Sequence, residues 1–205
     1  MKKIIFFYFI LSNCIGQKST IDTLEVKLIS QKGRNLCWAS SMEMIIKAID
    51  VKSIVSQKDI VKKLGIDCCM CECNKNCNDS QNCKSCDIEF AAEANRYDKL
   101  FKLLDIQSIQ KDSTVLSKDK IISEIKNKRP ILIAVRLNEN TNSILPNYKA
   151  NHTVVISGYF ENKGKMIIKI KDPFQQCKGQ LREIDYDTFF KDYKTTFVTN
   201  FVKVQ

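Results

Sequence analysis

This 205-residue chain contains a cysteine, a histidine and an aspartate that could serve as the nucleophile, the base and the orienting group of nucleophilic catalysis. Cys37 stands in QKGRNLCWASSMEM, residues 31–44, where a polar loop gives way to a segment of helical periodicity. At the start of a helix, unpaired backbone N–H groups and the helix dipole stabilise a thiolate, which is the nucleophilic form of cysteine. Cys37 is therefore a candidate nucleophile, and the alternative is a buried or disulfide-bonded cysteine like others among the ten.

A base and an orienting group for this cysteine can be found in the second half of the chain. His152 is the one histidine and opens the β-rich segment HTVVISGYF, and Asp172 follows twenty residues later in KDPF. If these two strands pair through a hairpin, Asp172 lies beside His152 and accepts a hydrogen bond from one imidazole nitrogen, leaving the other for Cys37. Taken singly, a lone histidine is usually structural, and an aspartate before a proline is a common turn residue.

Gln31 is the candidate oxyanion donor. It lies six residues before Cys37, so its side-chain amide could join the backbone N–H of Cys37 around a developing negative charge. A glutamine in a polar loop carries no such meaning by itself, and this role depends on the other three residues.

Several helices are expected to position these residues in the first part of the chain. Apolar residues recur at helical spacing over 37–50, Ser56 with Asp59 begins a second helix that Gly65 ends, and Ser117 begins another that ends before Pro130. A further helix is marked by its apolar residues Phe90, Ala94, Tyr97, Phe101 and Leu104.

The second part of the chain has the β-branched composition of strands. Strands are predicted at 131–136, 152–160, 165–171, 179–184 and 196–204, with a hairpin turn at ENKG, residues 161–164, and a short helical turn at 186–190. The expected fold class is α+β, with an N-terminal helical lobe, a C-terminal antiparallel β lobe and an active-site cleft between them. The segment 137–151 leads into His152 and is expected to border that cleft.

Together these residues resemble the papain-like cysteine peptidases. Gln31 followed by five residues and Cys37-Trp38-Ala39, then His152 and the Asp172-Pro173 pair, are similar to a bacterial branch that includes bacteriocin-leader-processing peptidases and plant-pathogen effector proteases. The resemblance covers residues 28–200. It implies a papain-like fold, Cys37 as nucleophile, His152 as base and acid, Asp172 as orienter and Gln31 as oxyanion donor. It implies a peptide or protein substrate and no cofactor.

The N-terminus has the pattern of an export signal. Two lysines precede a short apolar run in MKKIIFFYFILSNCIGQ, so residues 1–16 are predicted to be a signal peptide and 17–205 the peptidase domain of an exported bacterial protein. LSNC is also similar to a lipobox, which would leave Cys14 lipidated and anchored to the membrane. A buried N-terminal strand is the less favoured alternative.

Seven cysteines crowd one polar segment, 68–86, which is interpreted as an insertion between helices. With Cys14 and Cys37 set aside, eight cysteines remain, which is enough for four disulfides in an exported protein. These disulfide candidates are Cys68, Cys69, Cys71, Cys73, Cys77, Cys83, Cys86 and Cys177. The rival reading is a metal site formed by Cys83 and Cys86 with Cys68, Cys69, Cys71 and Cys73, which the crowded spacing disfavours.

The net charge of +10 does not by itself indicate nucleic-acid binding. The lysines are scattered along the whole chain and are not interleaved with aromatic residues, as a nucleic-acid groove would favour.

Three functions stay open from the sequence. The favoured one is an exported cysteine peptidase; the others are an amidase or acyl transferase that uses the same site, and a disulfide- or metal-rich binding protein with an inactive Cys37.

Overall fold

The computed structural model describes residues 21–33, 35–63, 97–111, 115–137, 152–174 and 177–204. The predicted signal peptide, Cys14, the cysteine-rich segment 68–86 and most of the segment 137–151 therefore lie outside the described residues. In the described ranges, no helix has the length and apolar character needed to cross a membrane.

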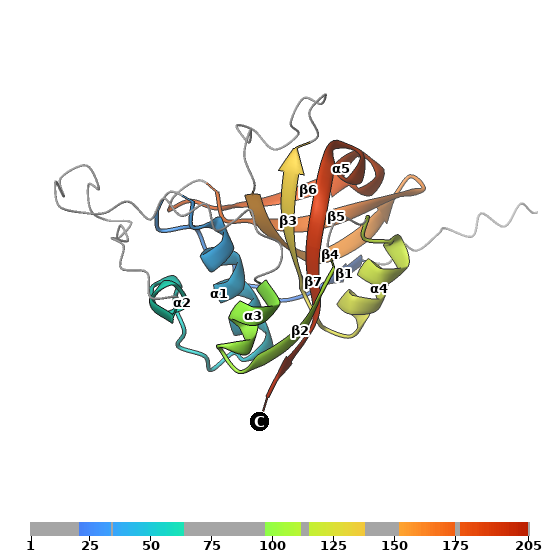
Figure 1. Ribbon diagram of the computed structural model, residues 1–205. Helices are drawn as coiled ribbons and strands as arrows, with labels where there is room; N and C mark the ends of the chain where they lie inside the picture. Colours follow the sequence, from blue (N-terminus) through green and yellow to red (C-terminus); the bar gives the residue numbers. More distant parts are fainter. Residues whose placement is uncertain are drawn as a thin grey trace, which may run out of the picture.

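One seven-stranded sheet forms the centre of the fold (Figure 1). Its strands run in the order β2-β7-β3-β4-β5-β6, and β1 pairs separately with β4. Every pairing is antiparallel. The strands are β1 (Ile21–Thr23), β2 (Ile106–Lys111), β3 (Ile131–Leu137), β4 (His152–Asn162), β5 (Lys165–Asp172), β6 (Gln180–Asp185) and β7 (Tyr193–Lys203).

The β4–β5 hairpin brings the start of β4 next to the end of β5. The two strands pair from Asn162 with Lys165 at the turn to Val155 with Lys171, and Gly164 occupies the turn with a positive φ of 75°. A glycine adopts that backbone conformation without steric cost. The hairpin predicted at ENKG is confirmed, and it carries His152 and Asp172 at its open end.

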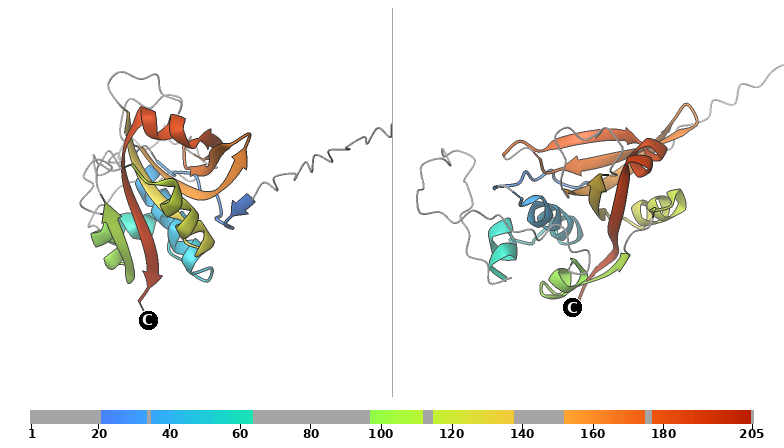
Figure 2. Two further views of the ribbon diagram at one scale, coloured as in Figure 1. Left: turned by 90° about the vertical axis from the view of Figure 1, so that its right-hand side faces the viewer. Right: turned by 45° about the horizontal axis from the view of Figure 1, so that its top comes forward.

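Successive residues of a strand point to opposite faces of the sheet. Both faces carry apolar residues here, and helices cover both of them. On one face, α1 (Cys37–Ile49) and α3 (Tyr97–Lys102) pack with Leu132, Val155 and Val198 in one hydrophobic core. On the other face, α4 (Lys118–Lys126) and α5 (Tyr186–Asp192) pack with Ile133 and Ile156 in a second core. Figure 2 shows α1 and α4 on opposite sides of the sheet.

The helix boundaries follow the capping residues of the sequence. Ser117 caps α4 by accepting the backbone N–H of Lys120 at 3.2 Å. Before α2 (Gln57–Lys63), the Asp59 carboxylate accepts the Ser56 N–H at 2.9 Å while the Ser56 hydroxyl accepts the Asp59 N–H at 3.4 Å. Both predicted helix starts are confirmed; Gly65, Phe90 and Ala94 lie outside the described residues.

The fold differs from the sequence-based expectation in two strands. Neither β1 nor β2 was predicted, so the chain is not a run of helices followed by a run of strands. β1 is only three residues long, and β2 (IQSIQK) has two apolar residues among polar ones, which is a weak signal. The α+β class is confirmed. The described residues form a single sheet with helices on both faces, and the expected helical lobe, β lobe and cleft between them stay a prediction.

Candidate active site

Cys37 is the first residue of α1 and lies buried at the helix N-terminus. The residue before it, Leu36, makes no side-chain cap, and the first turn of α1 has no acidic residue. The positive end of the α1 dipole therefore lies at Cys37, with no acidic side chain of the first turn to oppose a negative charge there.

His152 and Asp172 lie in contact at the open end of the β4–β5 hairpin. His152 Nε2 lies 2.7 Å from Asp172 Oδ1, and both side chains are almost completely buried. Since Nε2 bonds the carboxylate, the ring nitrogen that remains for a thiol is Nδ1. The juxtaposition inferred from the twenty-residue separation is thus present in the structure.

Two further donors hold the Asp172 carboxylate in place. Arg182 Nε donates to Oδ2 at 2.7 Å, and the backbone N–H of Phe174 donates to Oδ1 at 2.9 Å. Burial acts to raise the pKa of Asp172, but the hydrogen bond and charge of His152 and the hydrogen bonds from Arg182 and Phe174 outweigh it and lower that pKa. Asp172 is therefore an ionised acceptor for the imidazole at neutral pH.

Cys37 and His152 are coupled by a hydrogen bond and by their charges. Burial acts to raise the pKa of the Cys37 thiol, but the charge of His152 and hydrogen bonds from His152 and Thr153 lower it overall. Burial acts in the opposite sense on His152, whose pKa is nevertheless raised to about 9 by the Cys37 charge and the bond to Asp172. Between these two pKa values, the pair is a thiolate facing an imidazolium.

Thr153 and Tyr97 also lie near Cys37, and sequence reasoning predicted this for neither residue, since Tyr97 was assigned only to the apolar side of a helix. The Tyr97 hydroxyl lies 2.7 Å from Thr153 Oγ1, and the Ser41 hydroxyl donates to the Thr153 carbonyl at 3.0 Å. Burial and the nearby Cys37 charge raise the pKa of Tyr97, which keeps its hydroxyl protonated. These contacts join α3, α1 and β4, so only the folded chain could reveal them.

Gln31 is buried on the segment that precedes α1 and is tied to the Asp172 region. Its backbone N–H donates to Pro173 O at 3.0 Å, and its carbonyl accepts the Cys177 N–H at 3.1 Å. The side-chain Nε2 donates to Gly33 O at 3.0 Å. An amide nitrogen carries two hydrogens, so this bond leaves one N–H for another acceptor.

The two cysteines in the described ranges have different states. Cys37 is free, and Cys177 is disulfide-bonded. The other disulfide candidates and the six cysteines of the rival metal site lie outside the described residues. Within those ranges, no group of three or more His, Cys, Asp or Glu side chains is arranged to hold a metal ion.

Comparison with known families identifies a protease family. The model of the family described as "Peptidase_C39 like family" matches residues 23–199, which includes Gln31, Cys37, His152 and Asp172. None of the curated proteins matches the chain significantly. A match over this much of the chain supports cysteine peptidase activity in general and a peptide or protein as the substrate.

Proposed function

We propose that this chain, which belongs to the Peptidase_C39 like family, hydrolyses peptide bonds through a thioester on Cys37. The observation that carries the proposal is the His152–Asp172 contact of 2.7 Å, in a hairpin whose histidine also bonds the Cys37 thiol. A chain of hydrogen bonds thus joins the nucleophile to the base and the base to the orienting group, as thiol-dependent acyl transfer requires.

In the first half of the proposed reaction, the Cys37 thiolate attacks the carbonyl carbon of the scissile bond. A C–S bond forms and the carbonyl electron pair moves to oxygen, giving a tetrahedral oxyanion. His152 Nδ1 then gives its proton to the leaving amine nitrogen, the C–N bond breaks, and the acyl group remains on Cys37 as a thioester.

In the second half, His152 Nδ1 removes a proton from a water molecule, which attacks the thioester carbon. The C–S bond breaks, the acid product leaves, and the thiolate–imidazolium pair is restored. Asp172 holds the imidazole through Nε2 during both halves and stabilises its charged form. The oxyanion donors in this account are the Cys37 backbone N–H and the remaining N–H of Gln31.

The test is hydrolysis of a fluorogenic peptide library by the purified protein, with Cys37→Ala and His152→Ala as controls. The proposal predicts cleavage that both substitutions abolish. Hydrolysis of only non-peptide amides would favour an amidase or acyl transferase that uses the same residues. Cleavage that persists in Cys37→Ala would contradict the proposal.

Export is part of the same proposal. The charged and apolar order of residues 1–16 supports a signal peptide, with Cys14 as the site of an alternative lipid anchor. Disulfides in the segment 68–86 would be stable in that compartment. Labelling the protein's N-terminus after expression in a bacterial host tests this directly, and a mature chain that still begins at Met1 would count against export.

A further inference from the structure

The segment that carries Gln31 is held from both sides by hydrogen bonds. On one side, the N–H and C=O of Gln31 bond Pro173 and Cys177. On the other side, the neighbouring residues bond a single side chain, Gln57 of α2. Gln57 Nε2 donates to Ser30 O at 3.0 Å, and Gln57 Oε1 accepts the Lys32 N–H at 3.0 Å.

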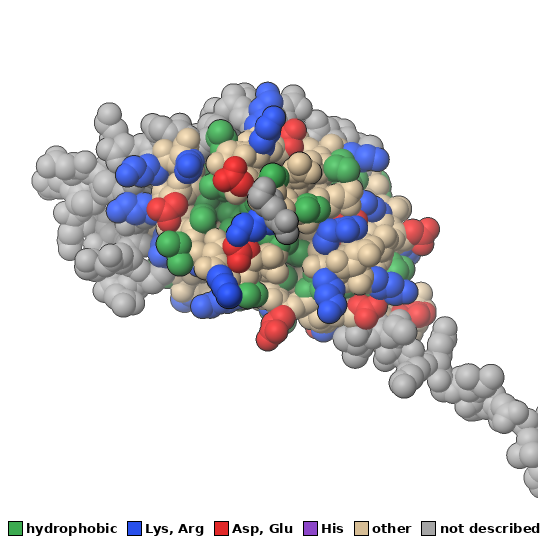
Figure 3. Space-filling view, turned by 90° about the horizontal axis from the view of Figure 1, so that it is seen from below, with side chains coloured by type: hydrophobic (Ala, Val, Ile, Leu, Met, Phe, Trp, Pro, Cys, Tyr) green, Lys and Arg blue, Asp and Glu red, His purple; other side chains and the backbone are tan. Residues whose placement is uncertain are grey.

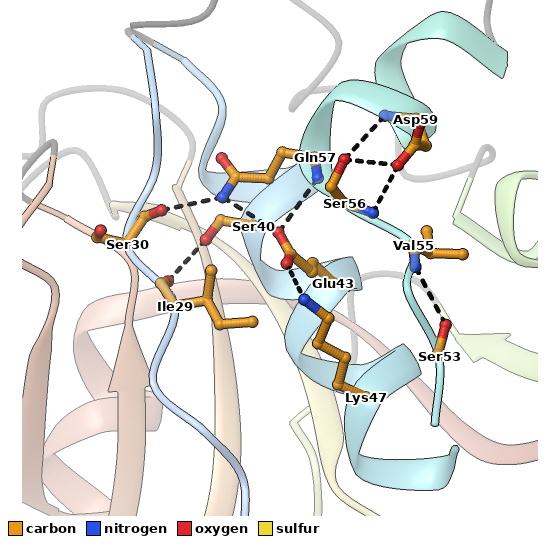
Figure 4. Close-up of polar contacts among 10 residues, drawn as sticks. All are labelled: Ile29, Ser30, Ser40, Glu43, Lys47, Ser53, Val55, Ser56, Gln57 and Asp59. Carbon is orange, nitrogen blue, oxygen red and sulfur yellow. Dashed lines mark hydrogen bonds and ion pairs between the residues drawn. The ribbon is translucent and has the colours of Figure 1, made fainter. Parts of the chain in front are cut away.

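Gln57 thus pairs with the backbone on either side of Gln31, much as a neighbouring strand would. Its third polar contact is with Glu43 of α1, whose Oε2 accepts from Gln57 Nε2 at 3.3 Å and from the Gln57 backbone N–H at 3.1 Å. Figure 4 shows the Gln57 amide between Ser30 and Glu43, with the Glu43 carboxylate also bonded to Lys47.

The chemistry of the partners allows only one orientation of this amide. Ser30 O and Glu43 Oε2 are acceptors, and the Lys32 N–H is a donor. Rotating the amide by 180° would set oxygen against two acceptors and an NH₂ group against a donor. Gln57 is fully buried, so water cannot relieve such a mismatch.

A second link ties the same segment to the nucleophile helix. The Ser40 hydroxyl, one turn after Cys37, donates to Ile29 O at 2.7 Å. α1 therefore carries the candidate nucleophile and, through Ser40 and Glu43, also fixes the backbone that presents Gln31.

We propose that Gln57 is a positioning residue of the active site, which sets the backbone of residues 30–32 so that the Gln31 amide can bind the oxyanion. The inference rests on the proposed function and adds a residue to it. Gln57 acts through Gln31 and not on the substrate, and Glu43 orients Gln57 in turn.

The test is a double-mutant cycle of Gln57→Met and Gln31→Ala, measured as kcat and KM on a cleaved peptide. Loss of one oxyanion donor lowers kcat on the order of 10²–10³-fold, which is the expected effect of Gln31→Ala. Gln57→Met keeps the side-chain volume and removes the hydrogen bonds of the Gln57 amide to Ser30, Lys32 and Glu43. It should lower kcat by about tenfold or more with little change in KM, because the oxyanion exists only in the transition state.

In the Gln31→Ala background, Gln57→Met should lower kcat by less than about twofold, because the group that it positions is gone. A purely structural role predicts the same loss in both backgrounds, and that result would overturn the inference. So would a Gln57→Met enzyme with wild-type kcat. If Gln57→Met does not fold, Gln57→Asn replaces it in the cycle, because its shorter amide cannot span both Ser30 and Lys32.

Ser56→Ala is the matched control. It removes the side-chain cap of the same helix and leaves the Gln57 amide in place. Its kcat should stay at the wild-type value. Hydrogen exchange of the Lys32 amide provides a readout that needs no substrate, and it should speed up in Gln57→Met and not in Ser56→Ala.

The two proposals fail in different ways. A wild-type protein that cleaves no peptide and has an unreactive Cys37 would overturn the proposed function, and the positioning role with it. A wild-type protein that cleaves peptides, combined with unchanged Lys32 exchange in Gln57→Met, would overturn only the role of Gln57.

Discussion

At the scale of single residues, the contacts of Asp172 explain why a carboxylate suits this position better than an amide. Oδ1 accepts from His152 and Phe174, and Oδ2 accepts from Arg182. An asparagine has one oxygen, so its NH₂ group would face either the guanidinium of Arg182 or the imidazole of His152. Arg182 thereby selects an acid as the orienting group.

Asp172→Asn should therefore lower kcat/KM strongly, by up to about 10⁴-fold, as the same change does in a Ser-His-Asp triad. Adding Arg182→Met should restore part of the activity, because the amide NH₂ no longer faces a cation and the amide oxygen can stay on His152. Steady-state kinetics of the three variants checks this. A double mutant no more active than Asp172→Asn would contradict it.

At the scale of elements, Glu124 of α4 holds the helix to the sheet. Its side chain is 1% exposed and accepts from Lys120 Nζ at 2.9 Å, from Arg129 Nε at 2.8 Å and from the Asn200 N–H of β7 at 3.1 Å. Burial acts to raise the pKa of Glu124, but hydrogen bonds from Arg129 and Lys120 lower it overall. Since folding lowers the pKa of Glu124, the ionised carboxylate stabilises the fold above the ordinary glutamate pKa of 4.5, and this stabilisation is lost as pH falls through the lower pKa of the folded state.

Glu124→Gln should lower the free energy of unfolding by about 1–3 kcal/mol at pH 7, because an NH₂ group replaces one acceptor oxygen. Urea unfolding at pH 7 and again below pH 4 measures the effect, which should shrink at the lower pH as the wild-type carboxylate protonates. Ser123→Ala, on the exposed side of the same helix, should stay within about 0.5 kcal/mol of wild type. A pH-independent difference for Glu124→Gln would rule out the carboxylate's charge as the cause.

The elements that local signals define could be predicted from the sequence. Apolar spacing and capping serines located α1, α2 and α4, and β-branched runs with the ENKG turn located the β4–β5 hairpin. That hairpin was enough to bring His152 to Asp172. The contacts of Thr153, Tyr97, Arg182 and Gln57 could not be predicted, because each joins segments that only the sheet topology brings together. Gln57 is 27 residues from Ser30 in the chain, and its helix reads as an ordinary polar surface helix.

At the scale of the whole molecule, Lys and Arg residues are scattered along the full length of the sequence. On the face seen in Figure 3, Lys and Arg side chains are scattered among acidic and apolar ones.

The separation of the two hydrophobic cores by the sheet has a consequence for function. α1, with the candidate nucleophile, packs in one core, and α4 packs in the other, across the sheet. Substitutions in α4 should therefore affect stability before they affect Cys37.

Disulfides are the prediction that concerns the whole chain. If the eight candidate cysteines are all paired, the intact mass of the unreduced protein should lie about 8 Da below the reduced value, because each bridge removes two hydrogens. Metal analysis should find no stoichiometric zinc. A fully reduced mass with one bound zinc per chain would instead favour the thiolate site.

The central claim is that Cys37 is a thiolate held by His152, and the pH dependence of its alkylation by iodoacetamide tests it most directly. The pKa of Cys37 is lowered and that of His152 is raised to about 9, so the thiolate should form at lower pH than in a free thiol, whose pKa is about 8.5, and a second inflection should appear near pH 9. In His152→Ala, burial remains without the imidazolium, so the first inflection should move above about 8.5 and the second should vanish. Wild-type and His152→Ala profiles that coincide with each other and with a free thiol would contradict the account.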